Sequence, residues 1–163
     1  STGLFKTSIT NASGQNSSRT SDAADKVISA DDDKGTTLNS TYHGHGQLKE
    51  VTMAGETQPL STILYDVYAR QTKLTDKNAG VINYSYNAYG ELEHQDDFNG
   101  AYDFEYDKLG RIINKKKTLD QSIETSWLYW ETGGGINQIK SISSNGISQN
   151  FTYDNLGRSA EIR

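Results

Sequence analysis

The chain has 163 residues, a net charge of −5 and no cysteine. Its length suits one domain or one part of a larger array. The charge argues against nucleic acid as a partner, because phosphate binding needs a basic patch, and the lack of cysteine excludes disulfides and thiolate metal sites. No stretch is long and apolar enough to span a membrane. Hydrophobic residues make up 33%, so we predict a thin core that rests on aromatic side chains.

The N-terminal segment, residues 1–35, is less regular than the rest. Residues 4–10 and 26–30 have the composition of strands. Residues 11–22 between them are rich in Ser, Asn and Thr and almost free of apolar side chains, which is typical of a surface loop. We therefore predict an irregular N-terminal hairpin with a long polar loop.

Residues 36–163 contain one segment six times, at steps of 20 to 24 residues, and a fixed period of this size indicates a repeat architecture. Residues 106–111 and 153–158 show the full motif, Tyr-Asp-x-x-Gly-Arg, whose places we number one to six. The other four copies are degenerate. The predicted structural residues of the six copies are Tyr42 and Gly46; Tyr65, Asp66 and Arg70; Tyr86, Asn87 and Gly90; Tyr106, Asp107, Gly110 and Arg111; Tyr129 and Gly133; and Tyr153, Asp154, Gly157 and Arg158.

Each repeat is predicted to hold two strands. Tyr102, Phe104 and Tyr106 alternate with Asp103 and Glu105, and this period of two is typical of a strand with one buried face. We expect the two acids to pair with lysines of the adjoining strand. Counted in this way, residues 36–163 hold roughly twelve strands.

The motif itself predicts a tight turn. Asp or Asn at position two and Gly at position five are the residues that a type I turn with a following left-handed residue prefers. The arginine at position six can pair with the turn aspartate or lie over the tyrosine ring. An exposed pair of that kind contributes only ~0–1 kcal/mol.

Together these elements predict an all-β fold, an antiparallel β-hairpin meander. Open sheets rarely exceed ~10 strands without curling, so we expect a curled and twisted sheet. The two unpaired edges of such a sheet are templates for another strand, and we expect self-association through them.

At this period, the Tyr-Asp-x-x-Gly-Arg motif resembles the YD repeat of the Rhs (rearrangement hot spot) family, which also occurs in the BC components of Tc toxins and in teneurins. The resemblance covers residues 36–163. It implies a β-ribbon that forms a hollow shell, around a toxin in the bacterial members, and part of an adhesion ectodomain in teneurins. The family's self-cleaving segment has an Asp-Pro motif. The single proline here, Pro59, follows Gln58, so no catalytic residue is carried over.

Other candidate sites are weak, and we predict no metal, no cofactor and no catalytic residues. His43 and His45 lie inside a turn, and His94 is the only further histidine, so a metal site would need added carboxylates. Residues 31–35 lack the spacing of a calcium loop, and we interpret them as a solvated turn between strands. Residues 133–135, three glycines, precede no helix that would hold a phosphate, and we interpret them as a loose turn.

We therefore expect a structural segment of a large secreted or surface bacterial Rhs-like protein, which scaffolds or encloses a toxin or other cargo. Its expected partners are the remaining repeats and that cargo. The alternative is a cell-surface adhesion or carbohydrate-binding module, for which Trp130 is the possible surface-binding residue, because alternation places it opposite Trp127 and Tyr129.

Overall fold

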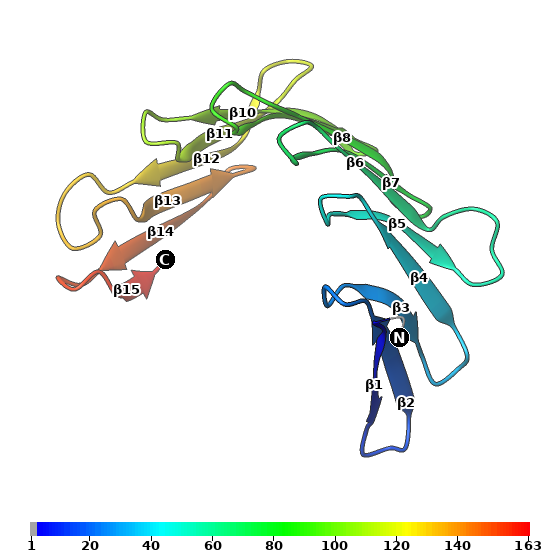
Figure 1. Ribbon diagram of the computed structural model, residues 1–163. Helices are drawn as coiled ribbons and strands as arrows, with labels where there is room; N and C mark the ends of the chain where they lie inside the picture. Colours follow the sequence, from blue (N-terminus) through cyan, green and yellow to red (C-terminus); the bar gives the residue numbers. More distant parts are fainter. Residues whose placement is uncertain (1–2) are drawn as a thin grey trace. The chain divides into compact units, whose positions relative to one another are not determined.

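The computed structural model describes residues 3–163, which form fifteen strands in one open antiparallel sheet (Figure 1). Each strand pairs with its neighbours in sequence, in the order β1 to β15. The predicted all-β hairpin meander is thus confirmed, and β4 to β15 account for the twelve strands expected after residue 36. Residues 3–163 offer no helix that could cross a membrane.

The sheet divides into two compact units, one ending at Asn83 and the other beginning at Tyr84. The first contains β1 (Phe5–Thr10), β2 (Asn16–Ser21), β3 (Val27–Asp31), β4 (Thr37–Tyr42), β5 (Leu48–Met53), β6 (Ser61–Tyr65), β7 (Gln71–Asp76) and the first half of β8 (Gly80–Tyr86). The second contains the end of β8, then β9 (Leu92–Asp97), β10 (Gly100–Tyr106), β11 (Ile112–Lys117), β12 (Ile123–Tyr129), β13 (Ile139–Ser144), β14 (Ile147–Tyr153) and β15 (Ser159–Ile162).

The N-terminal residues continue the meander, and the prediction of a long polar loop over residues 11–22 is wrong. Strand β2 lies inside that segment and pairs with β1 from Phe5↔Ser21 to Thr10↔Asn16. Strand β1 is exposed along its whole length. The backbone ladder holds these polar residues in place, and they carry no apolar alternation from which a strand could be predicted.

No hydrophobic residue among residues 3–163 is buried, and Ser21, which is 5% exposed, is the one buried polar side chain in that range. Strand β10, predicted to have one buried face, is half-buried along both faces. In a single layer, a side chain is shielded only by its neighbours on adjacent strands. Apolar and polar residues that alternate along a strand are therefore buried to a similar extent. The predicted thin core is absent from the part of the chain described.

The motif tyrosines tie each hairpin to the one before it. In four copies, the tyrosine hydroxyl donates to a backbone carbonyl of the preceding hairpin. The acceptor is the first residue after the turn of that hairpin. The pairs are Tyr42 to Val27 (2.8 Å), Tyr65 to Leu48 (3.0 Å), Tyr106 to Leu92 (2.9 Å) and Tyr129 to Ile112 (2.8 Å). The ring lies half-buried at the end of its strand while the hydroxyl satisfies a carbonyl at the start of the adjacent strand, which is how tyrosine is commonly used when half-buried.

A β-bulge accompanies position one of the motif. In the β10–β11 hairpin, Glu105 pairs with Asn114 and Tyr106 with Ile112, so that Ile113 is the extra residue. A bulge increases the local right-handed twist and bends its strand. The same shift occurs before Ser21, Tyr42, Tyr65, Tyr129 and Tyr153. Extra twist therefore enters at the same point of these repeats.

The tyrosine bond can be tested by replacing Tyr106 with phenylalanine, which removes only the hydroxyl that reaches Leu92. We expect Tyr106→Phe to lower the free energy of unfolding by about 1 kcal/mol, because the Leu92 carbonyl loses its donor. The measurement is urea denaturation followed by circular dichroism. Tyr89→Phe is the control, since Tyr89 is 90% exposed, and an equal loss in both variants would contradict the assigned role.

Candidate functional site

The motif turn is a short loop closed by its own aspartate. In the turn at residues 107–111, the amide of Asp107 donates to the carbonyl of Arg111 (2.9 Å) and that of Gly110 to the carbonyl of Asp107 (3.0 Å). Asp107 Oδ1 accepts from the amides of Leu109 (2.8 Å) and Arg111 (3.0 Å). Gly110 has a φ of 74°, a left-handed conformation that favours glycine. One carboxylate oxygen thus satisfies two turn amides at once.

The same four bonds recur in six further turns. They are opened by Asn11, Asp22, Asp32, Asp66, Asn87 and Asp154. The first three were not recognised as motif turns because no tyrosine precedes them, although residues 31–35 were predicted to form a turn. The signal was present in two of them, as Asn or Asp three residues before a glycine. The turn after Ser21 is a seventh copy of the repeat, 21 residues before Tyr42.

The arginine at position six of the motif hydrogen-bonds to the carboxylate of the aspartate that opens the turn. Arg70, Arg111 and Arg158 donate through Nε to the Oδ2 atoms of Asp66, Asp107 and Asp154 at 2.7, 2.6 and 2.7 Å. The hydrogen bond from the Arg111 side chain, followed by those from the turn amides, holds the pKa of Asp107 below its ordinary 3.8. The turn at residues 87–91 exchanges the roles, because Asn87 Nδ2 donates to Glu91 Oε2 at 2.7 Å.

Position six also reaches the tyrosine of the next repeat. In the first unit, Lys26 Nζ lies 5.5 Å from the centre of the Tyr42 ring. In the second, the Arg111 guanidinium lies 4.4 Å from the centre of the Tyr129 ring. Cation–π contacts of this kind contribute about 0.5–1 kcal/mol at exposed sites. Arg111 therefore makes both of the contacts considered from sequence, but the ring that it covers belongs to the following copy. Arg70 also lies 5.1 Å from the centre of the Tyr68 ring, in its own turn.

The side chain at position six of one turn ends beside the position-five residue of the next turn. A Cβ on Gly46 would lie 3.0 Å from Lys26 Nζ, and one on Gly110 would lie 3.0 Å from Glu91 Oε1. Arg111 donates through Nη1 to Oδ1 of Asn137, which has a φ of 65°. The Asn137 amide donates to the Trp130 carbonyl as that of Gly110 does to Asp107, so Asn137 holds position five of this longer turn, where the motif spacing predicted Gly133. We call this place, formed by the tyrosine ring and the position-five residue of the following turn, the inter-turn seat.

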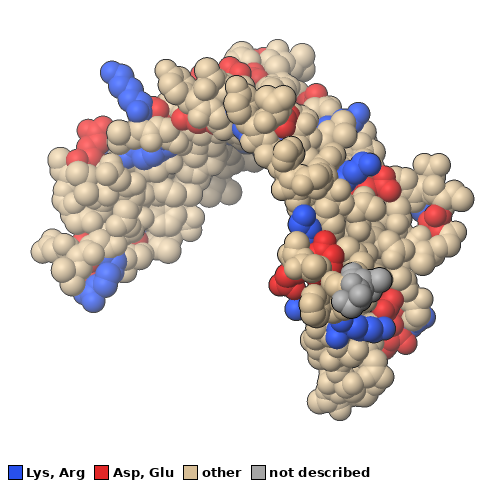
Figure 2. Space-filling view, in the orientation of Figure 1, with Lys and Arg blue, Asp and Glu red and all other residues tan. Residues whose placement is uncertain are grey.

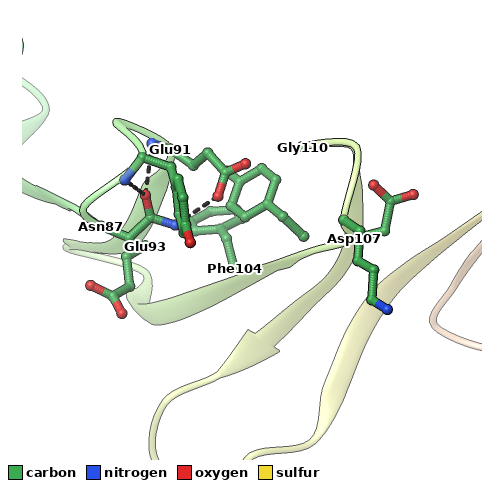
Figure 3. A pocket seen from close by; sticks show the side chains of 9 residues that line it. Asn87, Glu91, Glu93, Phe104, Asp107 and Gly110 are labelled. Carbon is green, nitrogen blue, oxygen red and sulfur yellow. Dashed lines mark hydrogen bonds between the residues drawn. The ribbon is translucent and has the colours of Figure 1, made fainter.

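Two grooves lie at junctions where position six is not a cation. In the first unit, a groove of about 530 Å³ separates the turn that ends at Gln47 from the Tyr65 copy. In the second, a groove of about 560 Å³ separates the turn that ends at Glu91 from the Tyr106 copy. Figure 3 shows Asn87 and Glu91 hydrogen-bonded on one turn beside Phe104, with Asp107 and Gly110 on the other turn. A residue without a charge at position six does not by itself open the seat, because Gln138 Nε2 donates to the Gly157 carbonyl at 2.9 Å and would lie 3.0 Å from a Cβ on Gly157.

Trp130, the predicted surface-binding residue, is half-buried and bonds within the sheet. Its indole N–H donates to the Phe151 carbonyl (3.1 Å), and Lys140 Nζ lies 4.9 Å from the ring centre. The bond joins the end of β12 to β14, as a motif tyrosine joins neighbouring hairpins. Trp130 also lines a groove of about 420 Å³ with Leu128 and Lys140.

The three glycines at residues 133–135 do not form the loose turn predicted. A Cβ on Gly134 would overlap the Asp154 carbonyl oxygen and lie 2.9 Å from Asn155 Cα, and one on Gly135 would lie 2.6 Å from the Tyr153 ring. This loop therefore packs directly on the following turn, beside Gln138, whose Nε2 donates to the Gly157 carbonyl at 2.9 Å. Glycine is required there because the two backbones approach each other closely.

The remaining polar candidates bind or pack against neighbouring side chains within the sheet. His94 Nδ1 lies 2.7 Å from Asp103 Oδ1, and Glu105 binds Lys116, so one of the two predicted acid–lysine pairs is found. His43 opens a turn and packs edge-on against Tyr65, 5.5 Å between ring centres. Within the described range, 3–163, no three His, Asp or Glu side chains are placed to hold a metal. On the face drawn in Figure 2, Lys and Arg are scattered among Asp and Glu.

Solved structures of Tc toxins share this fold. No family model and no curated protein matches the chain. A Tc holotoxin pore of Photorhabdus luminescens matches 91% of it with a TM-score of 0.66 and 18% identity, and a TcdB2–TccC3 crystal structure matches 98% with a TM-score of 0.68 and 15% identity. The chain spans only 9% and 11% of those two chains, respectively. At such identities the likeness shows the fold alone.

The turn carboxylates predict how stability depends on pH. Hydrogen bonds lower the pKa of Asp32, Asp107 and Asp154 in the folded chain. A carboxylate with a depressed folded pKa stabilises the fold above its unfolded pKa, and that stability is lost as the pH falls through the folded value. We expect the melting temperature to fall steeply below about pH 4, measured by calorimetry. A constant melting temperature down to about pH 2.5 would contradict this account.

The glycine loop gives a sharper test of packing. Gly134→Ala should destabilise the second unit by about 1–3 kcal/mol, because the new methyl group overlaps backbone atoms of the next turn. Gly44→Ala is the matched control, since open space surrounds Gly44 and its φ is not positive. Urea denaturation of both variants measures the difference. Equal stability would show that the loop does not pack on the Asp154 turn.

Proposed function

We propose that this chain is a structural YD-repeat segment of a large secreted or surface bacterial Rhs-like protein, where it forms part of a β-shell that encloses or scaffolds a toxin or other cargo. The observation that carries the proposal is that no hydrophobic residue in the described part of the chain is buried. Single-layer sheets of this kind are stable as parts of a wall, where neighbours cover the faces that they leave open. The proposal assigns no enzymatic activity.

The contacts between repeats support a role as a wall. Neighbouring hairpins are held together by the backbone ladder, in four copies also by the tyrosine hydroxyl bond, and at the Tyr42 and Tyr129 junctions by the inter-turn seat. All three connect neighbours along the chain. Proteins built in this way gain stability from nearest-neighbour interfaces and extend by adding repeats. Such an element suits an extended surface.

The comparisons support the proposal at the level of fold. The matched structures are described as a Tc holotoxin pore and as TcdB2–TccC3, and this chain matches about a tenth of each matched chain. The YD motif, present in full at residues 106–111 and 153–158, adds the family resemblance. On this proposal, the partners of the chain are further repeats and the components of a toxin complex.

The alternative, an adhesion or carbohydrate-binding module, has less support. It rests on Trp130, whose indole N–H already donates to the Phe151 carbonyl and whose ring has Lys140 above it. Stacking on a sugar would need a free ring face with polar groups beside it. The contacts of Trp130 therefore favour a role in holding the sheet together.

Small-angle scattering combined with a molar mass in solution tests the proposal. We expect an elongated or self-associated particle that binds the apolar dye ANS, because the edges β1 and β15 are unpaired and apolar side chains remain exposed on the sheet. A compact monomer near 18.0 kDa that binds no dye would contradict the proposal. That outcome would instead favour an independent binding module.

A further inference from the structure

The groove between the turns at residues 87–91 and 107–111 is an inter-turn seat without its cation. At the next junction in the same unit, Arg111 fills the seat, 4.4 Å from the centre of the Tyr129 ring. In the first unit, Lys26 fills the seat at Tyr42. At the Tyr106 seat, position six is Glu91, which cannot make a cation–π contact, and a groove of about 560 Å³ is open.

The lining of this groove suits a cation. Glu91, Glu93 and Asp107 bring carboxylates to it, and Phe104 and Tyr106 bring aromatic rings. Asp107 is already paired with Arg111 at 2.6 Å. Glu91 Oε2 accepts from Asn87, while its Oε1 is directed toward Gly110, where the cation of position six ends in other copies. A ring face and carboxylates at one place attract a guanidinium through charge and the ring quadrupole.

We infer that this groove binds an arginine side chain presented by a basic segment of a partner protein, which supplies the cation that this seat lacks and pairs with the Glu91 carboxylate that ends there. The partner's guanidinium lies over Tyr106 as Arg111 lies over Tyr129, and it pairs with Glu91 and Glu93. Tyr89, 90% exposed at the rim, offers a second ring. Lys108, which also lines the groove, is its one basic residue.

The Gln47 groove provides a comparison within the same chain. It has a similar volume, about 530 Å³, and a motif tyrosine, Tyr65, in its lining. Its position six is neutral, and its lining contains one carboxylate, that of Asp66, which is already paired with Arg70 at 2.7 Å. An arginine side chain should therefore distinguish the two grooves by charge, although both have an aromatic wall.

The test is an amide NMR titration of the whole chain with the peptide acetyl-Gly-Arg-Gly-amide. We expect shifts at Tyr89, Leu109 and Gly110, a dissociation constant on the order of millimolar, and no shifts around Tyr65. The same peptide with citrulline, which is nearly isosteric but uncharged, should bind at least about threefold more weakly. Equal binding of the two peptides would overturn the inference, because it would show that charge is not recognised.

Variants at position six separate the groove from general charge attraction. Glu91→Arg restores the motif cation, so it should fill the seat and abolish peptide binding while keeping or raising the melting temperature. Glu91→Gln should weaken binding at least about threefold, whereas Glu56→Gln, which removes the same charge in the other unit, should leave it unchanged. Unaltered binding in a folded Glu91→Arg variant would overturn the inference. So would calcium chloride shifting the same amides at lower concentration than the peptide, since the groove would then be a metal site.

Discussion

The hydrogen bond from a motif tyrosine to a backbone carbonyl of the preceding hairpin is the contact on which the repeat depends. It fixes where each hairpin lies against the one before, since Tyr106 at the end of β10 reaches Leu92 on the adjacent β9, and Tyr129 at the end of β12 reaches Ile112 on the adjacent β11. A sheet without a buried core has few other means of fixing its neighbours. The ring supplies half-buried apolar surface at the same point, so one residue type serves both packing and register.

Position six is where the repeats differ in chemistry while keeping the same geometry. Arg111 ties its own turn through Asp107 and covers the next tyrosine, whereas Glu91 ties its turn through Asn87 and leaves the tyrosine ring open. The junction after Arg111 is thus basic, whereas the junction after Glu91 is acidic and lined by an open groove. The fold is indifferent to this choice because the turn amides are satisfied by Asp107 or Asn87 alike. Binding sites can therefore be added to the wall without altering its backbone.

The sequence predicted what is local and regular. The turn follows from Asp107 and Gly110, and strand β10 from its alternation, because these features depend on residues near in sequence. Strand β2 was missed because it is polar and is specified by pairing with β1. The seat was missed because it joins residues such as Arg111 and Tyr129, which lie in different repeats. The close approach behind Gly134 was missed for the same reason, since glycine in a loop has the same appearance whether it is loose or tightly packed.

Degenerate copies persist because each repeat is held by several contacts that do not depend on one another. The first copy has Ser21 in place of tyrosine but retains the aspartate turn. The second has His43 in place of aspartate but retains the Tyr42 hydroxyl bond, and the third has Ala69 at position five, where it adopts a φ of 64°. Each copy loses a different contact and retains the backbone ladder. A wall held in this way tolerates variation at any one junction, provided that the adjacent junctions are intact.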